Sequence, residues 1–191
     1  MRLFVALQIP DSIRNDYGKV IDDLRRFDAK AAPKKPKWVR PENLHVTLKF
    51  IGHTNPAKLD SIRETLAKVR SPQEVHLHFR NIGFFPSAKR PRVIWGGMEA
   101  SENLALLAQA VDEQMATLGF PAEERAFTPH LTLARLDPPG IAQELRTVIE
   151  KQATRDFGEL QTSEFHLIES KLKPSGAEYT TLRSFPFVSK D

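Results

Sequence analysis

The residues of this 191-residue chain that could do chemistry together occur in a repeated pattern, His-apolar-Thr-apolar. The first copy runs from His45 to Leu48, and the second runs from His130 to Leu133. In a β-strand, residues i and i+2 point to the same face, so each copy would present one imidazole and one hydroxyl on one side. For a chain with six histidines, chance predicts roughly 0.06 copies of this pattern. Two copies, one in each half, therefore predict a single site that uses two histidines.

Two imidazoles and two hydroxyls suit phosphoryl transfer. Histidine titrates near neutral pH, so one of His45 and His130 can accept a proton while the other donates one. Each such proton transfer typically contributes ~10²–10⁴ in rate. The hydroxyls of Thr47 and Thr132 can donate to the non-bridging oxygens of a phosphoryl group held between the imidazoles. In-line displacement at phosphorus needs a base on the attacking side and an acid on the leaving side. Because the pattern supplies both, we expect no metal and no cofactor.

A metal site is the competing interpretation of the histidines. Two histidines with no nearby cysteine or carboxylate make a poor ligand set, and the chain has no cysteine. A second pair, His76 and His78, would share one strand face and could also hold a metal. Because Val75, Leu77 and Phe79 alternate with them, the pattern favours an amphipathic strand that exposes both histidines.

Composition indicates a globular protein with an anionic partner. The 40% apolar and 27% charged residues are usual for soluble domains, and the absence of cysteine fits a reducing compartment. The apolar run Met1–Leu7 is too short for a signal segment or a membrane span, so we expect a cytoplasmic protein with no membrane contact. The net charge is +4, and basic residues before the first motif would make a rim that attracts phosphate. Two basic clusters stand out: Lys30, Lys34, Lys35, Lys37 and Arg40, then Lys89, Arg90 and Arg92.

Hydrophobic periodicity places each motif on a strand within a repeated unit. It predicts strands over residues 2–8, 44–51, 75–82, 92–98, 129–135, 163–171 and 178–187, and helices over 12–27, 56–70, 102–118 and 140–154. Both halves therefore follow the order strand, helix, motif strand, helix, strand. We expect an α+β fold in which residues 1–191 form one domain of two duplicated lobes, approximately 1–85 and 92–187, with strand exchange allowed between them. Each lobe would be a mainly antiparallel sheet with outer helices, and the two sheets would face each other across a central cleft.

The segments Trp38–Gly52 and Thr128–Arg135 together resemble the two-histidine (2H) phosphoesterase superfamily. Within it, they are most similar to the RNA 2′,3′-cyclic phosphodiesterase group, formerly called 2′-5′ RNA ligases. The resemblance implies a hydrolase, independent of metal and ATP, that opens RNA 2′,3′-cyclic phosphate ends to 2′-phosphates, with reversible, ATP-independent 2′-5′ RNA ligation as a further activity. It also implies roles for the motif residues. His130 would be the proton acceptor that activates water, His45 would be the proton donor to the departing 3′-oxygen, and Thr47 and Thr132 would bind the phosphate.

Two further residues lie at matching positions, five residues after each histidine: Phe50 and Arg135. The resemblance implies that they stack on the terminal base from either side, and both an aromatic ring and a guanidinium can do so. In a regular strand, however, an odd offset points each to the face opposite its histidine. Phe50 would then continue the core face with Leu48, and it would reach the cleft only through a bulge or at the end of the strand. Arg135 is easier to place in the cleft, because a buried unpaired arginine is costly.

The leading functional hypothesis is an RNA 2′,3′-cyclic phosphodiesterase that works as a monomer. Its partners would be RNA with 2′,3′-cyclic phosphate ends or small cyclic nucleotides. One alternative is a 2H phosphodiesterase for a different cyclic phosphate or for a 2′-5′ oligonucleotide. The other is an RNA-binding module without catalysis, which would use the basic loops and would bind RNA in a salt-sensitive way.

Overall fold

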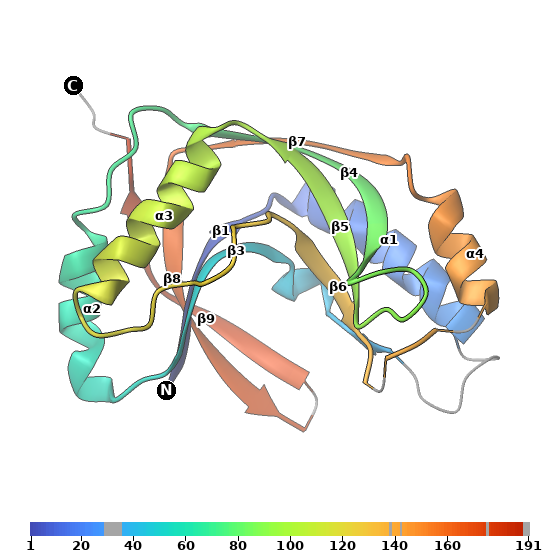
Figure 1. Cartoon of the computed structure of the whole chain (residues 1–191), viewed down its shortest axis with the longest axis horizontal. Helices are drawn as coiled ribbons and strands as arrows, with labels where there is room; N and C mark the ends of the chain where they lie inside the picture. Colours follow the sequence, from blue (N-terminus) through green and yellow to red (C-terminus); the bar gives the residue numbers. More distant parts are fainter. Residues whose placement is uncertain (29–35, 138, 142, 175, 189–191) are drawn as a thin grey trace.

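Antiparallel strands form one curled sheet with helices on its outer side. The structure, a computed structural model, describes residues 1–28, 36–137, 139–141, 143–174 and 176–188 (Figure 1). The elements in these ranges are β1 (Arg2–Gln8), α1 (Asp11–Asp28), β2 (Lys37–Trp38), the 3-10 turn η1 (Pro41–Asn43), β3 (His45–His53), the 3-10 turn η2 (Pro56–Lys58), α2 (Leu59–Leu66), β4 (Val75–Phe85), β5 (Val93–Ala100), α3 (Asn103–Ala116), β6 (Leu131–Arg135), α4 (Gln143–Lys151), β7 (Asp156–Thr162), β8 (Glu164–Lys173) and β9 (Gly176–Pro186). The predicted α+β class is confirmed.

The strands run across the sheet in the order β7-β4-β5-β6-β3-β1-β8-β9, and β2 pairs with β6 at the side. The expected two sheets are therefore joined into one, through the contact between β3 and β6. Strand partners also cross the expected lobe boundary. β4 comes from residues 1–85 but pairs with β5 and β7, whereas β8 and β9 return from the end of the chain to pair with β1.

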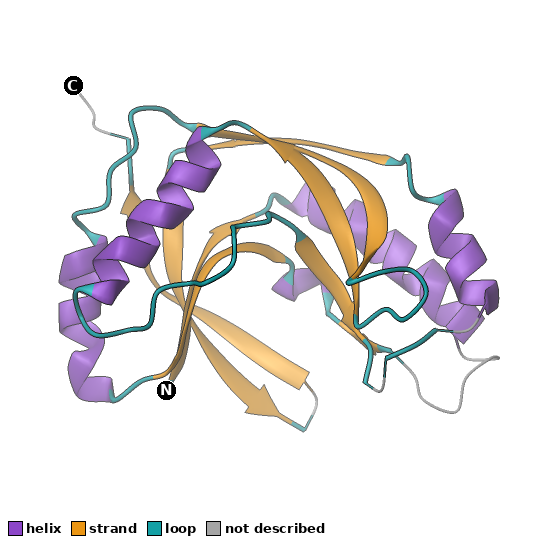
Figure 2. Ribbon diagram, in the orientation of Figure 1, coloured by secondary structure: helices purple, strands orange, loops and turns teal. Residues whose placement is uncertain are grey.

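The helices cover the two halves of the sheet in pairs (Figure 2). α1 packs on α4 and β7, and α3 packs on α2 and β3. The ring of Tyr17 from α1 is fully buried and stacks on Phe157 of β7, with 3.8 Å between ring centroids. Gly96 of β5 makes room for this ring, because a Cβ there would lie 2.7 Å from Tyr17. No helix in the described ranges is both long and apolar enough to cross a membrane.

The structure differs from the predicted elements mainly at edges and ends. β7 was not predicted, because only Phe157 in it is buried, whereas charged and polar residues occupy most other positions. The helix predicted over 56–70 is shorter: it begins as a 3-10 turn and continues as α2, which ends at Leu66. Asn55 caps its start as expected, since its side chain accepts a hydrogen bond from the backbone of Ala57. α4 is likewise shorter than the range 140–154.

Candidate active site

The two motif strands lie side by side at the centre of the sheet. β3 and β6 pair in antiparallel register through Val46 and Leu131, the residues that follow each motif histidine. In an antiparallel pair, the residues flanking such a contact face one another in reversed order. Each histidine is therefore placed beside the threonine of the other motif, as His45 is beside Thr132. Val46 and Leu131 are themselves buried on the opposite face, as the alternating pattern predicts.

The two histidine rings are held in the same way. Nδ1 of His45 lies 2.7 Å from the carbonyl oxygen of Asn43, and Nδ1 of His130 lies 2.8 Å from the carbonyl oxygen of Thr128. A carbonyl oxygen can only accept a hydrogen bond, so Nδ1 carries the proton and donates in both rings. This arrangement leaves Nε2 of each ring as the nitrogen that can exchange a proton with a substrate.

Aromatic side chains from distant segments pack against both histidines. The ring of Phe4 in β1 lies 4.7 Å from the ring of His45, and that of Tyr179 in β9 lies 5.4 Å from it, edge to face. On the other side, Phe85 at the end of β4 lies 5.3 Å from His130, also edge to face. Sequence reasoning gave none of these three a role at the site. No pattern in the sequence marks these three residues, because only the pairing of strands that are distant in the chain brings them to the histidines.

The hairpin of β8 and β9 is fastened to the segment that precedes His45. The side-chain amide of Asn43, in η1, donates to the carbonyl oxygen of Ala177 at a distance of 2.7 Å. The backbone carbonyl of the same Asn43 accepts from His45, so one residue orients the imidazole and anchors the hairpin that brings Tyr179 to it. Burial raises the pKa of Tyr179, which keeps its hydroxyl protonated and able to donate.

A β-bulge in β3 determines the face of the sheet to which Phe50 points. The pairing of β1 with β3 shifts by one residue, which leaves Leu48 as an extra residue between Thr47 and Lys49. Leu48 and Lys49 are both buried, whereas the next residue, Phe50, is 53% exposed. The bulge thus returns Phe50 to the face of Thr47. The interpretation of Phe50 as a core residue is wrong, because it assumed a regular strand.

β6 has the same irregularity at the equivalent position. Its pairing with β5 matches Ile94 with Ala134 but Trp95 with Thr132, which skips Leu133. Leu133 and Ala134 are both buried, and Arg135, the next residue, is exposed. Both motif strands therefore carry an extra residue three positions after the histidine. The two bulges bring the residue five positions after each histidine back to the side of the site.

A small cavity lies where these side chains meet. Its volume is about 60 Å³, and it is lined by Val39, Asn43, His45, Thr47, Phe50, Thr132, Arg135 and Tyr179. Burial lowers the pKa of His45; the hydrogen bond to the Asn43 carbonyl opposes this shift, and the positive charge of Arg135 adds to it. An anion bound in the cavity would favour the protonated imidazole again.

Only part of the first predicted basic cluster can be located. Lys30, Lys34 and Lys35 lie outside the described residues. Lys37 is exposed on β2, and its backbone lies opposite that of Arg135 in the antiparallel pairing of β2 with β6. Arg40 forms an ion pair with Glu42 at 3.8 Å. The second cluster, Lys89, Arg90 and Arg92, lies in the loop between β4 and β5.

The pair His76 and His78 lies on β4, away from the motif strands. Val75, Leu77 and Phe79 are buried there, as expected for an amphipathic strand. Nε2 of His78 lies 2.7 Å from a carboxylate oxygen of Asp156. Within the described ranges, the structure has no group of three or more side chains placed to hold a metal.

The chain is similar along most of its length to known proteins of one family. The family model of the 2′-5′ RNA ligase superfamily matches residues 9–174. The RNA 2′,3′-cyclic phosphodiesterase of Archaeoglobus fulgidus is 36% identical over 185 residues, covering 97% of this chain and 99% of that protein. The protein of the same name from Methanocaldococcus jannaschii is 35% identical over 97% of this chain and its own full length.

Solved structures share the fold along the whole chain. A crystal structure of a Thermus thermophilus protein superposes with a TM-score of 0.79 at 28% identity, covering 100% of both chains. Escherichia coli LigT, crystallised with 3′-AMP, gives a TM-score of 0.71 at 26% identity over 98% of both chains. The family model and the relatives each span nearly the entire chain, so the chain belongs to the 2′-5′ RNA ligase superfamily.

Proposed function

We propose that this chain is an RNA 2′,3′-cyclic phosphodiesterase that opens the cyclic phosphate to a 2′-phosphate. The observation that carries the proposal is the pairing of the two His-x-Thr strands through Val46 and Leu131. This register sets each imidazole beside the hydroxyl of the other motif, and the Nδ1 of each imidazole donates to a backbone carbonyl. Acid–base chemistry at phosphorus needs such an arrangement. The relatives named RNA 2′,3′-cyclic phosphodiesterase support the same substrate.

In the proposed mechanism, the cyclic phosphate binds between the two histidines. The hydroxyls of Thr47 and Thr132 donate to its non-bridging oxygens, and the guanidinium of Arg135 adds positive charge. Nε2 of His130 accepts a proton from the attacking water, and Nε2 of His45 donates a proton to the 3′-oxygen as its bond to phosphorus breaks. The product keeps its phosphate on the 2′-oxygen.

Phe50 and Arg135 would position the terminal nucleoside by stacking on its base. Both histidines come from one chain, so the proposal needs only a monomer. RNA with cyclic phosphate ends and small cyclic nucleotides would compete for the same site, and we propose the cytoplasm as the place of action. A 5′-hydroxyl that attacks the cyclic phosphate in place of water, with the same bond to the 3′-oxygen broken, would give reversible 2′-5′ ligation without ATP.

The direct test is to incubate the protein with an RNA that ends in a 2′,3′-cyclic phosphate, in the presence of EDTA. The expected product is the 2′-phosphate, which chromatography separates from the 3′-phosphate. Replacing His45 or His130 with Asn should each lower kcat by at least ~10²-fold, because acid and base act in the same step. His53→Asn is the matched control, since His53 is exposed at the far end of β3, and it should keep wild-type activity.

The alternatives give different results in the same assay. A 2H enzyme for another cyclic phosphate would leave the RNA end intact and hydrolyse a different substrate, with the same dependence on both histidines. An RNA-binding module would bind RNA in a salt-sensitive way and would keep that binding in both Asn variants, with no product. Turnover that survives in either Asn variant would contradict the two-histidine mechanism.

A further inference from the structure

The two motif histidines differ in how the chain holds their backbones. His45 is the first residue of β3 and pairs with Gln8 of β1. His130 lies one residue before β6 begins, and residues 121–130 belong to no helix or strand. His130 also lines a groove of about 540 Å³ between α3 and the segment that leads into β6. Side-chain contacts must therefore do for His130 what strand pairing does for His45.

Phe85, the last residue of β4, packs against the ring of His130. The two ring centroids are 5.3 Å apart, and the planes meet edge to face at 78°, a geometry that aromatic pairs prefer. Within the described residues, His130 has this one aromatic neighbour, whereas His45 has two. The Thr128 carbonyl, which accepts from Nδ1, and the Phe85 ring are therefore the contacts that orient the His130 imidazole.

The ring of Phe85 is in turn stacked on Trp95 of β5. Their centroids are 5.2 Å apart, and their planes differ by 29°. Trp95 pairs with Gly83 of β4 on one side and with Thr132 of the second motif on the other. Because directly paired residues point to the same face of a sheet, the indole lies on the face that carries Thr132. The stack of Trp95 and Phe85 therefore reaches His130 along the face of the sheet on which the site is built.

Two glycines make the space in which the indole of Trp95 lies against the sheet. A Cβ at Gly83 would overlap the six-membered part of the indole, and a Cβ at Gly97 would lie 2.6 Å from it. The indole N–H is buried and has no hydrogen-bond partner among the described residues. A buried donor without a partner costs free energy, so packing between the two glycines and Phe85, and not a hydrogen bond, fixes where the indole lies.

We propose that Phe85 and Trp95 are positioning residues for His130: the indole holds Phe85 against the imidazole, so that Nε2 stays aimed at the attacking water. The inference rests on the proposed function, in which His130 is the base. A base must lie within hydrogen-bond reach of the proton that it removes, and a displacement of about 1 Å can lower the rate ~10²-fold. Phe85 and Trp95 line neither the small cavity nor the groove. Their loss should therefore lower kcat and leave KM nearly unchanged.

The test measures kcat and KM for adenosine 2′,3′-cyclic monophosphate. Phe85→Leu removes the ring but keeps an apolar side chain, and kcat should fall roughly 10- to 100-fold with KM within about twofold of wild type. Phe85→Tyr keeps the ring and should retain about half of the wild-type kcat or more. Gly83→Ala leaves Phe85 and His130 in the sequence but displaces the indole, because the atoms nearest to the new Cβ all belong to Trp95. It should lower kcat as Phe85→Leu does.

A second measurement does not depend on activity. The ring current of Phe85 should displace the NMR signals of the His130 ring protons, which are assigned by their absence in His130→Asn. The displacement should vanish in Phe85→Leu. It should change in Gly83→Ala, in which Phe85 is still present. Thermal melts check that each variant folds.

Phe84→Leu is the matched control, because Phe84 precedes Phe85 in β4 and packs against the hydrophobic core instead. It should keep kcat and the His130 signals of the wild type. The inference is overturned if Phe85→Leu keeps wild-type kcat, if its loss appears in KM alone, if Phe84→Leu loses as much, or if Gly83→Ala changes neither kcat nor the His130 signals. A wild-type protein that does not open the cyclic phosphate would refute the proposed function, and this inference with it.

Discussion

Leu48 and Leu133 occupy equivalent places, three residues after the histidine of each motif, and each is the extra residue of a bulge. Each bulge reverses the face of the sheet to which the residues after it point. As a result, Phe50 and Arg135 point away from the core, to the same face of the sheet as the histidines. The inserted residue that follows each threonine therefore extends the His-x-Thr motif by a third residue on the same face, one that can stack on a base.

The exposed position of Phe50 predicts that its substitution affects activity and not stability. Phe50→Ala should weaken binding of a cyclic nucleotide substrate by roughly 5- to 160-fold, because stacking on a base contributes about 1–3 kcal/mol. KM measures this effect. The free energy of unfolding should change by less than about 1 kcal/mol, because the ring is half-exposed.

Its neighbour Ile51 is the control, since it is 8% exposed on the core side of the same strand. Ile51→Ala should lower the free energy of unfolding by about 2–5 kcal/mol and should leave KM nearly unchanged. If Phe50→Ala destabilised the protein as much as Ile51→Ala does, the ring would belong to the core.

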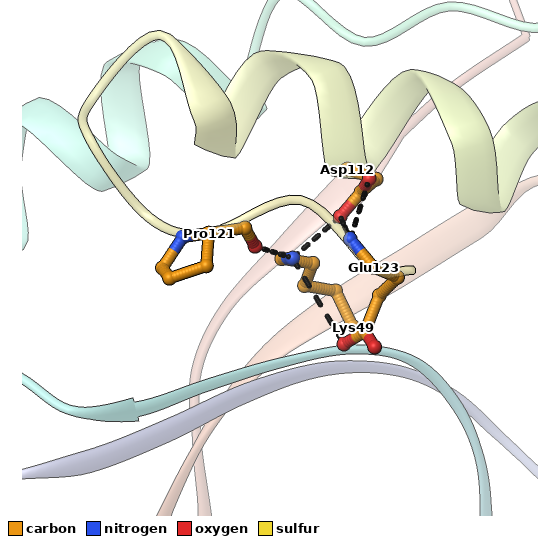
Figure 3. A network of polar contacts seen from close by, with 4 residues as sticks. All are labelled: Lys49, Asp112, Pro121 and Glu123. Atoms are coloured by element: carbon orange, nitrogen blue, oxygen red, sulfur yellow. Dashed lines mark hydrogen bonds and ion pairs between the residues drawn. The ribbon is translucent and has the colours of Figure 1, made fainter. Parts of the chain in front are cut away.

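Among the secondary-structure elements, β3 and α3 depend on one another through a buried charge. Lys49 directly follows the bulge residue, and its ammonium is paired with Asp112 and hydrogen-bonded to the carbonyl of Pro121 (Figure 3). A buried ion pair adds little net stability compared with apolar residues, but removing one partner leaves the other unpaired. The pair therefore fixes which face of α3 and which part of the following segment lie against the motif strand.

Lys49→Met should lower the free energy of unfolding by about 3 kcal/mol, because it leaves the Asp112 carboxylate without its partner. Urea denaturation measures this loss. The double variant Lys49→Met/Asp112→Leu should recover part of it, since no charge is then left unpaired. Lys19→Met is the surface control, because that side chain is 71% exposed in its pair with Asp16, and its cost should be about 0–1 kcal/mol. Equal losses in the two single variants would mean that the buried pair has no special role.

For the molecule as a whole, two histidines link stability to pH: His45, which is partly buried, and His166, which is buried. Burial lowers the pKa of His45 and of His166 below the ordinary value of 6.5. Both groups therefore bind a proton less readily in the folded chain than in the unfolded chain. Their contribution to stability is fully present above pH 6.5 and is lost as the pH falls below 6.5 through the lowered pKa values.

The free energy of unfolding should therefore fall between pH 7.5 and pH 5, by at most about 1.4 kcal/mol per pH unit for each histidine. Urea denaturation at a series of pH values gives the slope. His166→Gln should reduce the slope, and His53→Gln, at an exposed position, should leave it unchanged. A stability that is constant or rises over this range would contradict the assignment.

The amino-acid sequence by itself determined the chemistry, most of the elements and the fold class. Residue types and a period of two place an imidazole and a hydroxyl on one side of each motif strand, and helical periodicity identifies α1 and α3 nearly in full. These features are local, because they depend on residues a few positions apart. Edge strand β7 was not found, since most of its residues are exposed and its pattern is weak.

The tertiary structure alone decided what surrounds the motif. The bulges at Leu48 and Leu133 exist only relative to the partner strands β1 and β5, and Phe4 and Tyr179 meet His45 only because β1, β3, β8 and β9 are neighbours. The groove beside His130 likewise needs α3 and the segment after it to be held together. These contacts join residues far apart in the chain, so no spacing within the sequence encodes them.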